Sequence, residues 1–313
     1  MRAVMYHYVR DSDARPPRGY YHLPVEQFRR QLDYLDEQFT LLSRSAFFDC
    51  LRGDRTPPED GVVLTFDDGL LDHYDCVLPE LQRRRLWGIF FVSTAPLVEN
   101  RRLAVHRIHT LVSEYPGPEL LDALRDTLDG SEFPEASGDD MYPDREVADE
   151  VRTFKRILNQ DIPYDQLPGV LDALERQFPK AGDVGVEDLY ITADQLADIA
   201  DAGMVIGAHA ISHRVLSRLS PERQRTEVVR SKRQLEEMSD TSVDLFAYPY
   251  GTEPTYTDHT VETVRDAGFD AAFTTVSGDI TSEEMTERPF TLRRRDCAEI
   301  RHGDSSVDLP GGD

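Results

Sequence analysis

A repeated alternation of apolar segments and segments with helical periodicity constrains the fold of this chain most strongly. Buried strands are expected at residues 3–9, 62–66, 88–93, 204–208, 245–248 and 271–275. Amphipathic helices are expected among them at residues 24–38, 45–51, 72–84, 221–238 and 260–267. Strands that alternate with helices form a parallel sheet with right-handed crossovers. The sequence therefore predicts an α/β fold built on a parallel sheet or barrel.

The strand signals stop in the middle of the chain. Between residues 97 and 202, helical patterns at 104–114, 119–128, 145–158 and 164–178 replace them. We interpret residues of about 100–195 as a helical insertion in a single barrel domain that spans residues 1–300. An acidic loop at residues 130–144 lies within the insertion, and the acidic tail at residues 301–313 is expected to be disordered.

Composition excludes several classes of function. The chain has 59 acidic and 35 basic residues, a net charge of -24, so it lacks the positive charge with which proteins bind nucleic acid or anionic membranes. Its longest apolar runs, such as residues 89–92, are far shorter than the roughly 20 residues of a membrane span. We recognise no secretory signal, and Cys50, Cys76 and Cys297 fit free thiols of a reducing compartment. A cytoplasmic protein is the expectation.

Two adjacent carboxylates end one expected strand. Asp67 and Asp68 follow residues 62–66 directly and precede Gly69. Barrel enzymes keep their catalytic groups at this carboxyl-terminal rim of the strands. Neighbouring residues point in different directions, so one carboxylate could bind a metal ion while the other transfers a proton. A solvated Asp-Asp-Gly turn is the alternative.

Two histidines follow another expected strand. His209 and His213 are four residues apart, which brings both onto one face if the turn between them is helical. Two imidazoles and one carboxylate leave positions open for water and substrate, as catalytic zinc and other first-row metal sites require. The alternative is a pair of unrelated histidines in a strand–helix turn. Together with the two aspartates, the pair favours a metal site.

Residues 65–69 (TFDDG) and 209–213 (HAISH) resemble the first two motifs of the NodB-like polysaccharide deacetylases, carbohydrate esterase family 4. Residues 5–8 (MYHY) and 246–251 (FAYPYG) are similar to further segments of that family. The resemblance covers nearly the whole chain. It implies a distorted (β/α)7 barrel with a helical insertion, and a metal-dependent amide hydrolase that removes acetyl from an N-acetylated sugar.

The resemblance also implies roles for individual residues. Asp67 would be the general base, and Asp68, His209 and His213 would hold a divalent metal ion, with zinc expected first and cobalt, manganese or nickel as alternatives. Tyr250 would donate its backbone N–H to the oxyanion that forms when water attacks the acetyl carbonyl. Acetate and a sugar amine would be the products.

The third motif departs from the family pattern. Many relatives begin it with an arginine that orients the base, whereas this chain has Phe246 at that point. The arginine must come from elsewhere, and Arg293, Arg294 and Arg295 are the candidates, with Arg294 at their centre. A solvated strand end is the alternative interpretation of this cluster.

The general acid is the second departure, because the late Leu-x-His motif that supplies it in many relatives is missing. His106 and His109 are three residues apart and could share one helical face near the barrel mouth. We take His106 as the first candidate and His7 as the second, with Asp67 acting in both directions as the fallback. Purely structural roles are the alternative for the three histidines.

The predicted function is the metal-dependent removal of N-acetyl groups from an amino sugar in surface glycan metabolism. The sugar could be linked to a nucleotide, a lipid or an oligosaccharide. Two alternatives remain open: a hydrolase of another linear or cyclic amide, and a glycan-binding barrel without turnover. The sequence predicts no particular oligomeric state.

The basic residues generate a first testable prediction, since 32 are Arg and only 3 are Lys. With a net charge of -24, this ratio indicates either a GC-rich genome or a halophilic protein whose self-repulsion is screened by molar salt. For a halophilic protein, the melting temperature rises steeply between low salt and molar KCl. A melting temperature that stays constant across a calorimetric KCl series leaves only the genomic explanation.

Overall fold

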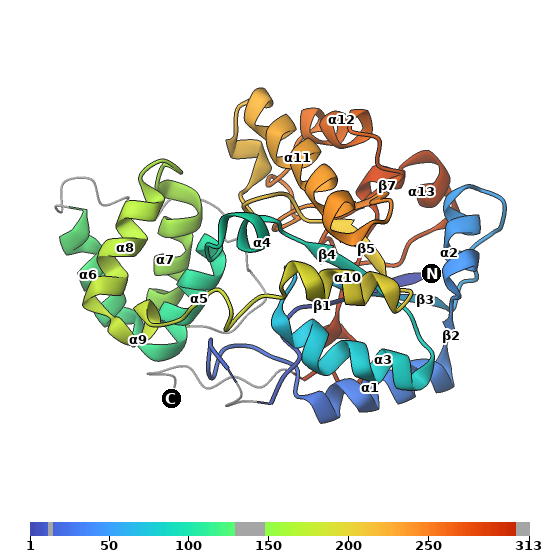
Figure 1. Ribbon diagram of the computed structural model, residues 1–313, viewed down its shortest axis with the longest axis horizontal. Coiled ribbons are helices and arrows are strands. Elements are labelled where there is room, and N and C mark those ends of the chain that lie inside the picture. Colours follow the sequence, from blue (N-terminus) through green and yellow to red (C-terminus); the bar gives the residue numbers. More distant parts are fainter. Residues whose placement is uncertain (12–14, 129–147, 305–313) are drawn as a thin grey trace. The chain divides into compact units, whose positions relative to one another are not determined.

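The computed structural model describes residues 1–11, 15–128 and 148–304, which form two compact units (Figure 1). Of the described residues, the first unit contains 1–11, 23–101 and 189–304. The second contains 15–22, 102–128 and 148–188. The predicted acidic loop, and all of the predicted tail beyond residue 304, lie outside the described residues.

The first unit is built on a curled parallel sheet. Its strands are β1 (Arg2–Tyr6), β2 (Thr40–Leu41), β3 (Gly61–Phe66), β4 (Ile89–Val92), β5 (Val205–Ala208), β6 (Leu245–Ala247), β7 (Ala271–Phe273) and β8 (Arg295–Asp296). They follow the order β7-β6-β5-β4-β3-β1-β8, and β2 pairs with β3 outside that path. Helices surround the sheet (Figure 1). This confirms the predicted α/β barrel-like fold.

The strands are apolar because both faces of the sheet are covered. Every residue of β3 and β4 is buried, as expected where helices cover one face and side chains fill the inside of the curl. On one face, Phe66 stacks on Tyr6 and on Phe90, with ring centroids 5.2 Å and 4.8 Å apart. These contacts join three neighbouring strands below the rim.

The helices of this unit are α1 (Val25–Gln38), α2 (Arg44–Leu51), α3 (Leu78–Arg84), α4 (Ala95–Glu99), α10 (Ala193–Asp201), α11 (Pro221–Ser239), α12 (Asp258–Asp266) and α13 (Ser282–Glu287). A π-helical turn, His73–Val77, leads into α3, so the single helix expected at residues 72–84 is divided. The hydroxyl of Ser220 accepts a hydrogen bond from the backbone N–H of Arg223 and caps α11, the longest described helix. Short 3-10 turns are present at Leu216–Arg218, Pro289–Thr291 and Cys297–Glu299.

The second unit is helical, as the loss of strand signals predicted. It contains α5 (Ala104–Glu114), α6 (Gly117–Thr127), α7 (Asp149–Arg156), a π-helical turn at Ile157–Asp161, α8 (Leu167–Gln177) and α9 (Pro179–Gly182). Among the helices in the described ranges, none combines the length and apolar character that a bilayer-spanning segment requires.

The described residues 15–22 belong to the second unit, although they precede its helices in the sequence. Tyr20 holds this segment. Its buried ring stacks on the imidazole of His109 at 4.1 Å between centroids, and its hydroxyl accepts a hydrogen bond of 3.0 Å from the ammonium group of Lys155. A short aromatic segment of this kind has no periodicity that would reveal its packing.

A buried carboxylate on α3 generates a prediction about acid stability. Glu80 is 5% exposed and binds the guanidinium groups of Arg83 and Arg84, at 2.5 and 2.6 Å. The hydrogen bond from Arg83 has the largest effect on Glu80 and lowers its pKa. Burial opposes this effect, the hydrogen bond from Arg84 adds to it, and the resulting pKa is about 2. The folded pKa is thus below the unfolded one, so the stabilisation is complete above about pH 5 and is lost as pH falls toward 2.

Glu80→Gln should therefore lower the free energy of unfolding at pH 7 by up to about 3 kcal/mol. The difference from the wild type should shrink toward pH 3 in urea titrations. Glu26→Gln is the control, because Glu26 meets Arg29 and Arg30 on the exposed side of α1, where ion pairs contribute little. An equal and pH-independent loss in both variants would contradict the prediction.

Candidate functional site

The candidate site lies at the carboxyl ends of neighbouring strands in the first unit. Asp67 and Asp68 follow β3, and His209 follows β5. His7 follows β1, which pairs with β3 through Tyr6 and Phe66. The parallel register thus places side chains from distant parts of the sequence at the same rim.

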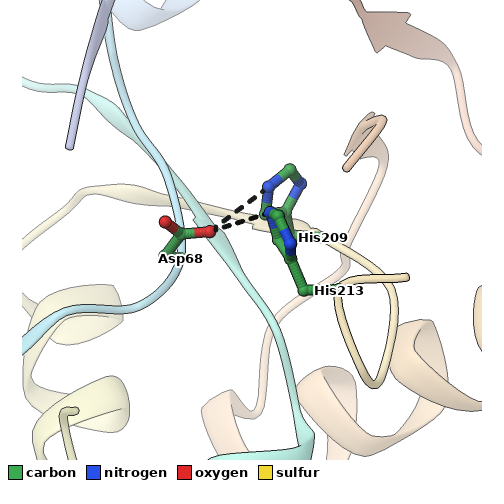
Figure 2. Close-up of side chains that lie close together, drawn as sticks. All are labelled: Asp68, His209 and His213. Carbon is green, nitrogen blue, oxygen red and sulfur yellow. Dashed lines mark ion pairs between the residues drawn. The ribbon is translucent and has the colours of Figure 1, made fainter. Parts of the chain in front are cut away.

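Asp68, His209 and His213 form the candidate metal site (Figure 2). One carboxylate oxygen of Asp68 lies 3.5 Å from Nε2 of His209 and 3.3 Å from Nε2 of His213. Atoms that bind one tetrahedral ion at about 2.0 to 2.2 Å are about 3.3 to 3.6 Å apart. All three side chains are buried, and their spacing fits a metal ion.

The tautomer of His209 supports this assignment. Its Nδ1 lies 2.7 Å from the carbonyl oxygen of Ala247, which can only accept, so Nδ1 carries the proton. Burial lowers the pKa of His209, so the ring is neutral and the lone pair of Nε2 faces Asp68. A lone pair directed at a carboxylate is repulsive unless a cation lies between them. The donor set therefore fits a divalent metal.

The turn between the two histidines differs from the expectation. It is not helical, because Ala210 and His213 both adopt left-handed backbone conformations, with φ of 59° and 52°. Glu227 of α11 holds the turn, since its carboxylate accepts hydrogen bonds from the backbone N–H groups of Ile211 and Ser212 at 2.9 and 2.8 Å. The histidines meet through this strained turn rather than through helical spacing.

Asp67 has a different environment from its neighbour. Both of its oxygens accept hydrogen bonds from Arg294, at 2.6 and 2.7 Å, and both side chains are almost fully buried. Burial alone would raise the pKa of Asp67, but the charge of Arg294, together with smaller contributions from His209 and His7, lowers it overall. The carboxylate is therefore ionised and fixed in orientation.

The arginine cluster separates into three roles. Arg294 contacts the carboxylate of Asp67, and its Nε also donates to the carbonyl of Thr274 at 2.9 Å. Arg293 lies 3.3 Å from Glu284, and Arg295 lies 2.6 Å from Asp279. Of the three arginines, Arg294 is the one that contacts Asp67, and its role as a substitute for the arginine of the third motif stays a prediction.

His7 also reaches this site. Its Nε2 lies 4.0 Å from Asp67, and its side chain is 35% exposed. The backbone carbonyl of His7 accepts a hydrogen bond of 2.9 Å from Nε2 of buried His73. His73 was not predicted as a site residue, because its only signal in the sequence is its position four residues after Gly69 at the start of a helical segment.

Tyr250 lies close to the candidate ligands. Its backbone is left-handed, with φ of 64°, and its ring centroid is 5.0 Å from that of His213. Its carbonyl accepts a hydrogen bond of 2.5 Å from the hydroxyl of Thr275, which holds the turn after β6. The role of its N–H toward an oxyanion stays a prediction.

His106 and His109 lie on α5 in the second unit. His106 is completely buried, and its ring centroid is 5.7 Å from that of His109, which stacks on Tyr20. These contacts show a packing role for the pair within its own unit. Proton donation by His106 stays a prediction.

The geometry predicts that loss of a candidate histidine ligand and loss of the Asp67 carboxylate differ in their effect on metal binding. His209→Ala and His213→Ala should each lower the content of zinc or cobalt in the purified protein, because each removes a ligand. Asp67→Asn should keep the metal, because it removes no ligand, although its amide can accept only one of the two hydrogen bonds from Arg294 and so lowers the melting temperature. Elemental analysis and melting temperatures of the three variants provide the check. Full metal content in the histidine variants would contradict the assignment.

Comparisons with known proteins agree with this geometry. A family model described as polysaccharide deacetylase matches residues 161–272, a range that contains His209, His213 and Tyr250. The candidate polysaccharide deacetylase YxkH of Bacillus subtilis (strain 168) is 26% identical over 95 residues. That alignment covers 30% of this chain and 33% of YxkH, so the chain matches about a third of the length of this curated relative.

Solved structures share the fold over most of the chain. The deacetylase PplD of Streptococcus pyogenes has a TM-score of 0.57 at 18% identity, with coverage of 99% of this chain and 93% of PplD. IcaB of Ammonifex degensii has a TM-score of 0.56 at 19% identity, over 94% and 90% of the two chains. The de-N-acetylase of Aggregatibacter actinomycetemcomitans has a TM-score of 0.54 at 14% identity, over 100% and 96%. The family model, which matches part of the chain, and the shared fold confirm the resemblance to the polysaccharide deacetylases that the motifs indicated.

Proposed function

We propose that this protein is a metal-dependent hydrolase that removes N-acetyl groups from an amino sugar within a glycan. One observation carries the proposal: adjacent carboxylates have separate partners. Asp68 faces two histidines, whereas Asp67 is held by Arg294. A ligand and a base are the two roles that hydrolysis of an amide by metal-activated water requires. The similarity to polysaccharide deacetylases supports an N-acetyl sugar as the substrate.

Asp68, His209 and His213 would hold the metal ion, with zinc expected first for two nitrogen donors and one oxygen donor. Cobalt, manganese and nickel are accepted by the same donor set. When bound, such an ion polarises a carbonyl and lowers the pKa of water. Nδ1 of His209, which donates to Ala247, keeps the ring in the orientation that this role needs.

Asp67 would accept the proton of the attacking water. Arg294 keeps the carboxylate ionised and fixes its plane, while further lone pairs of its oxygens stay available for the water. Tyr250 lies beside His213, so its N–H would donate to the oxygen of the acetyl group as negative charge develops there. Collapse of the tetrahedral species then releases acetate and needs a proton for the departing amine.

His7 is the proton donor that the geometry favours. It lies next to Asp67 and is partly exposed, so it can receive a proton from that carboxylate or from solvent and pass it to the amine. His73 fixes the backbone of His7 and thereby the origin of its side chain. His106 was the first candidate from the sequence, but its described contacts lie within the second unit.

The experiment that tests the function is acetate release. Metal-loaded protein is incubated with N-acetylglucosamine oligomers, and each hydrolysed acetamide lowers the mass of the product by about 42 Da. The metal-retaining variant Asp67→Asn is the control and should release no acetate. Hydrolysis of other amides without action on sugars would favour the alternative hydrolase. Glycan binding without any turnover would favour a non-catalytic barrel.

The same assay predicts which histidine donates the proton. His7→Gln should lower kcat by about 10²- to 10⁴-fold and remove the alkaline limb of the pH profile, with unchanged metal content. His106→Gln should affect stability more than kcat, because that ring is buried in a helical core. If His106→Gln lost the alkaline limb and His7→Gln kept it, the proton would come from the second unit.

A further inference from the structure

One segment of the first unit has a local excess of basic residues. The net charge of the chain is -24, yet residues 211–234 contain seven basic and only two acidic residues. This segment begins in the turn that carries His213 and continues along α11 (Figure 1). A local excess of positive charge on such an acidic protein is a candidate binding surface for an anion.

Three arginines on α11 form what we call the arginine stripe: Arg223, Arg230 and Arg233. Their spacing of seven and three residues places them on one face of the helix. The opposite face is buried through Val228 and Leu235. The three arginines are exposed, and within residues 1–11, 15–128 and 148–304 none of their guanidinium groups forms an ion pair or hydrogen bond.

Other arginines of the unit have carboxylate partners, whereas the exposed Arg44, Arg55 and Arg85 form no ion pair among the described residues. Arg84 binds Asp33 at 2.5 Å, and Arg295 binds Asp279 at 2.6 Å. The three neighbouring guanidinium groups of the stripe, which bind no carboxylate of the described residues, are thus available to a partner from outside the chain.

The stripe is connected to the candidate site. Glu227, which holds the turn before His213, lies between Arg223 and Arg230 on α11. Glu227 follows Arg223 by four residues, so the two residues are about 6 Å apart along the helix axis. The whole stripe spans ten residues, about 15 Å. A molecule with one sugar at the metal site could therefore extend along these arginines.

We propose that the substrate is an acidic glycan, and that the arginine stripe binds carboxylates on the sugars next to the one that loses acetyl. This inference rests on the proposed function. A surface with net charge of -24 repels an anionic polymer, so its binding requires a basic path at the site. A diphosphate places its charges at one point, whereas carboxylates repeated along a sugar chain match arginines repeated along a helix.

Arginine is also suited to bind carboxylates through direct hydrogen bonds. A guanidinium group donates two parallel hydrogen bonds to a carboxylate, which lysine cannot do. If the protein works in molar salt, the screening length is about 3 Å, and attraction over longer distances is lost. Paired hydrogen bonds at contact distance persist under those conditions better than long-range steering does.

The test compares two substrates in two triple variants. The substrates are oligosaccharides of alternating glucuronic acid and N-acetylglucosamine, and uncharged N-acetylglucosamine oligomers of equal length. The stripe variant is Arg223→Gln/Arg230→Gln/Arg233→Gln. The control variant is Arg44→Gln/Arg55→Gln/Arg85→Gln, which removes the same charge from exposed arginines near the amino-terminal ends of the strands.

In the stripe variant, the ratio of kcat/KM for the acidic to the uncharged oligomer should fall about tenfold, mainly through KM. The control variant should keep the wild-type ratio. Equal losses in both variants, or an unchanged ratio in the stripe variant, would overturn the proposal. A loss confined to uridine-diphosphate-linked N-acetylglucosamine would assign the stripe to a diphosphate instead.

Binding separates this proposal from the proposed function. Calorimetry with the Asp67→Asn variant measures the affinity for both oligomers without turnover. If the wild type releases no acetate from any of these sugars, the proposed function is wrong. Tighter binding of the acidic oligomer that is lost in the stripe variant would still support the arginine stripe as a binding surface for acidic glycans. If neither oligomer is preferred, the stripe proposal fails whatever the activity.

Discussion

The buried ion pair between Asp67 and Arg294 is the interaction on which the rest of the site depends. Two charges removed from water are costly, and the cost is offset here by two short hydrogen bonds between the groups and a third from Arg294 to Thr274. The loss of one partner alone would leave an uncompensated buried charge, at about 3 to 5 kcal/mol. The pair thus stabilises the sheet while it keeps Asp67 ionised beside the candidate ligands.

Short-range signals account for the parts of the fold that the sequence predicted. Helix α5 and the helix expected at residues 24–38 agree with the structure almost residue by residue, because each buries a clear apolar stripe. The two-residue strands β2 and β8 were missed, since two residues carry no periodicity. Helix α13 was also missed, because it buries only two residues against the unit.

In the candidate site, too, the sequence predicted the residues of short motifs but not the contacts between distant segments. Asp67, Asp68, His209 and His213 were found because their chemistry lies in two short motifs. The partner of Asp67 could only be narrowed to three neighbouring arginines, since the choice depends on how β8 lies beside β1. His73 acts through the backbone of His7, a contact that leaves no trace in residue type or spacing.

The position of β8 has a consequence for the order in which the site is assembled. All three candidate metal ligands are present once residue 213 has been synthesised, but the counter-charge of Asp67 arrives only with Arg294, next to the last strand of the sheet. A domain generally folds as a unit once its chain is available. A chain truncated before residue 294 would therefore carry all three candidate ligands while the carboxylate of Asp67 lacks its counter-charge.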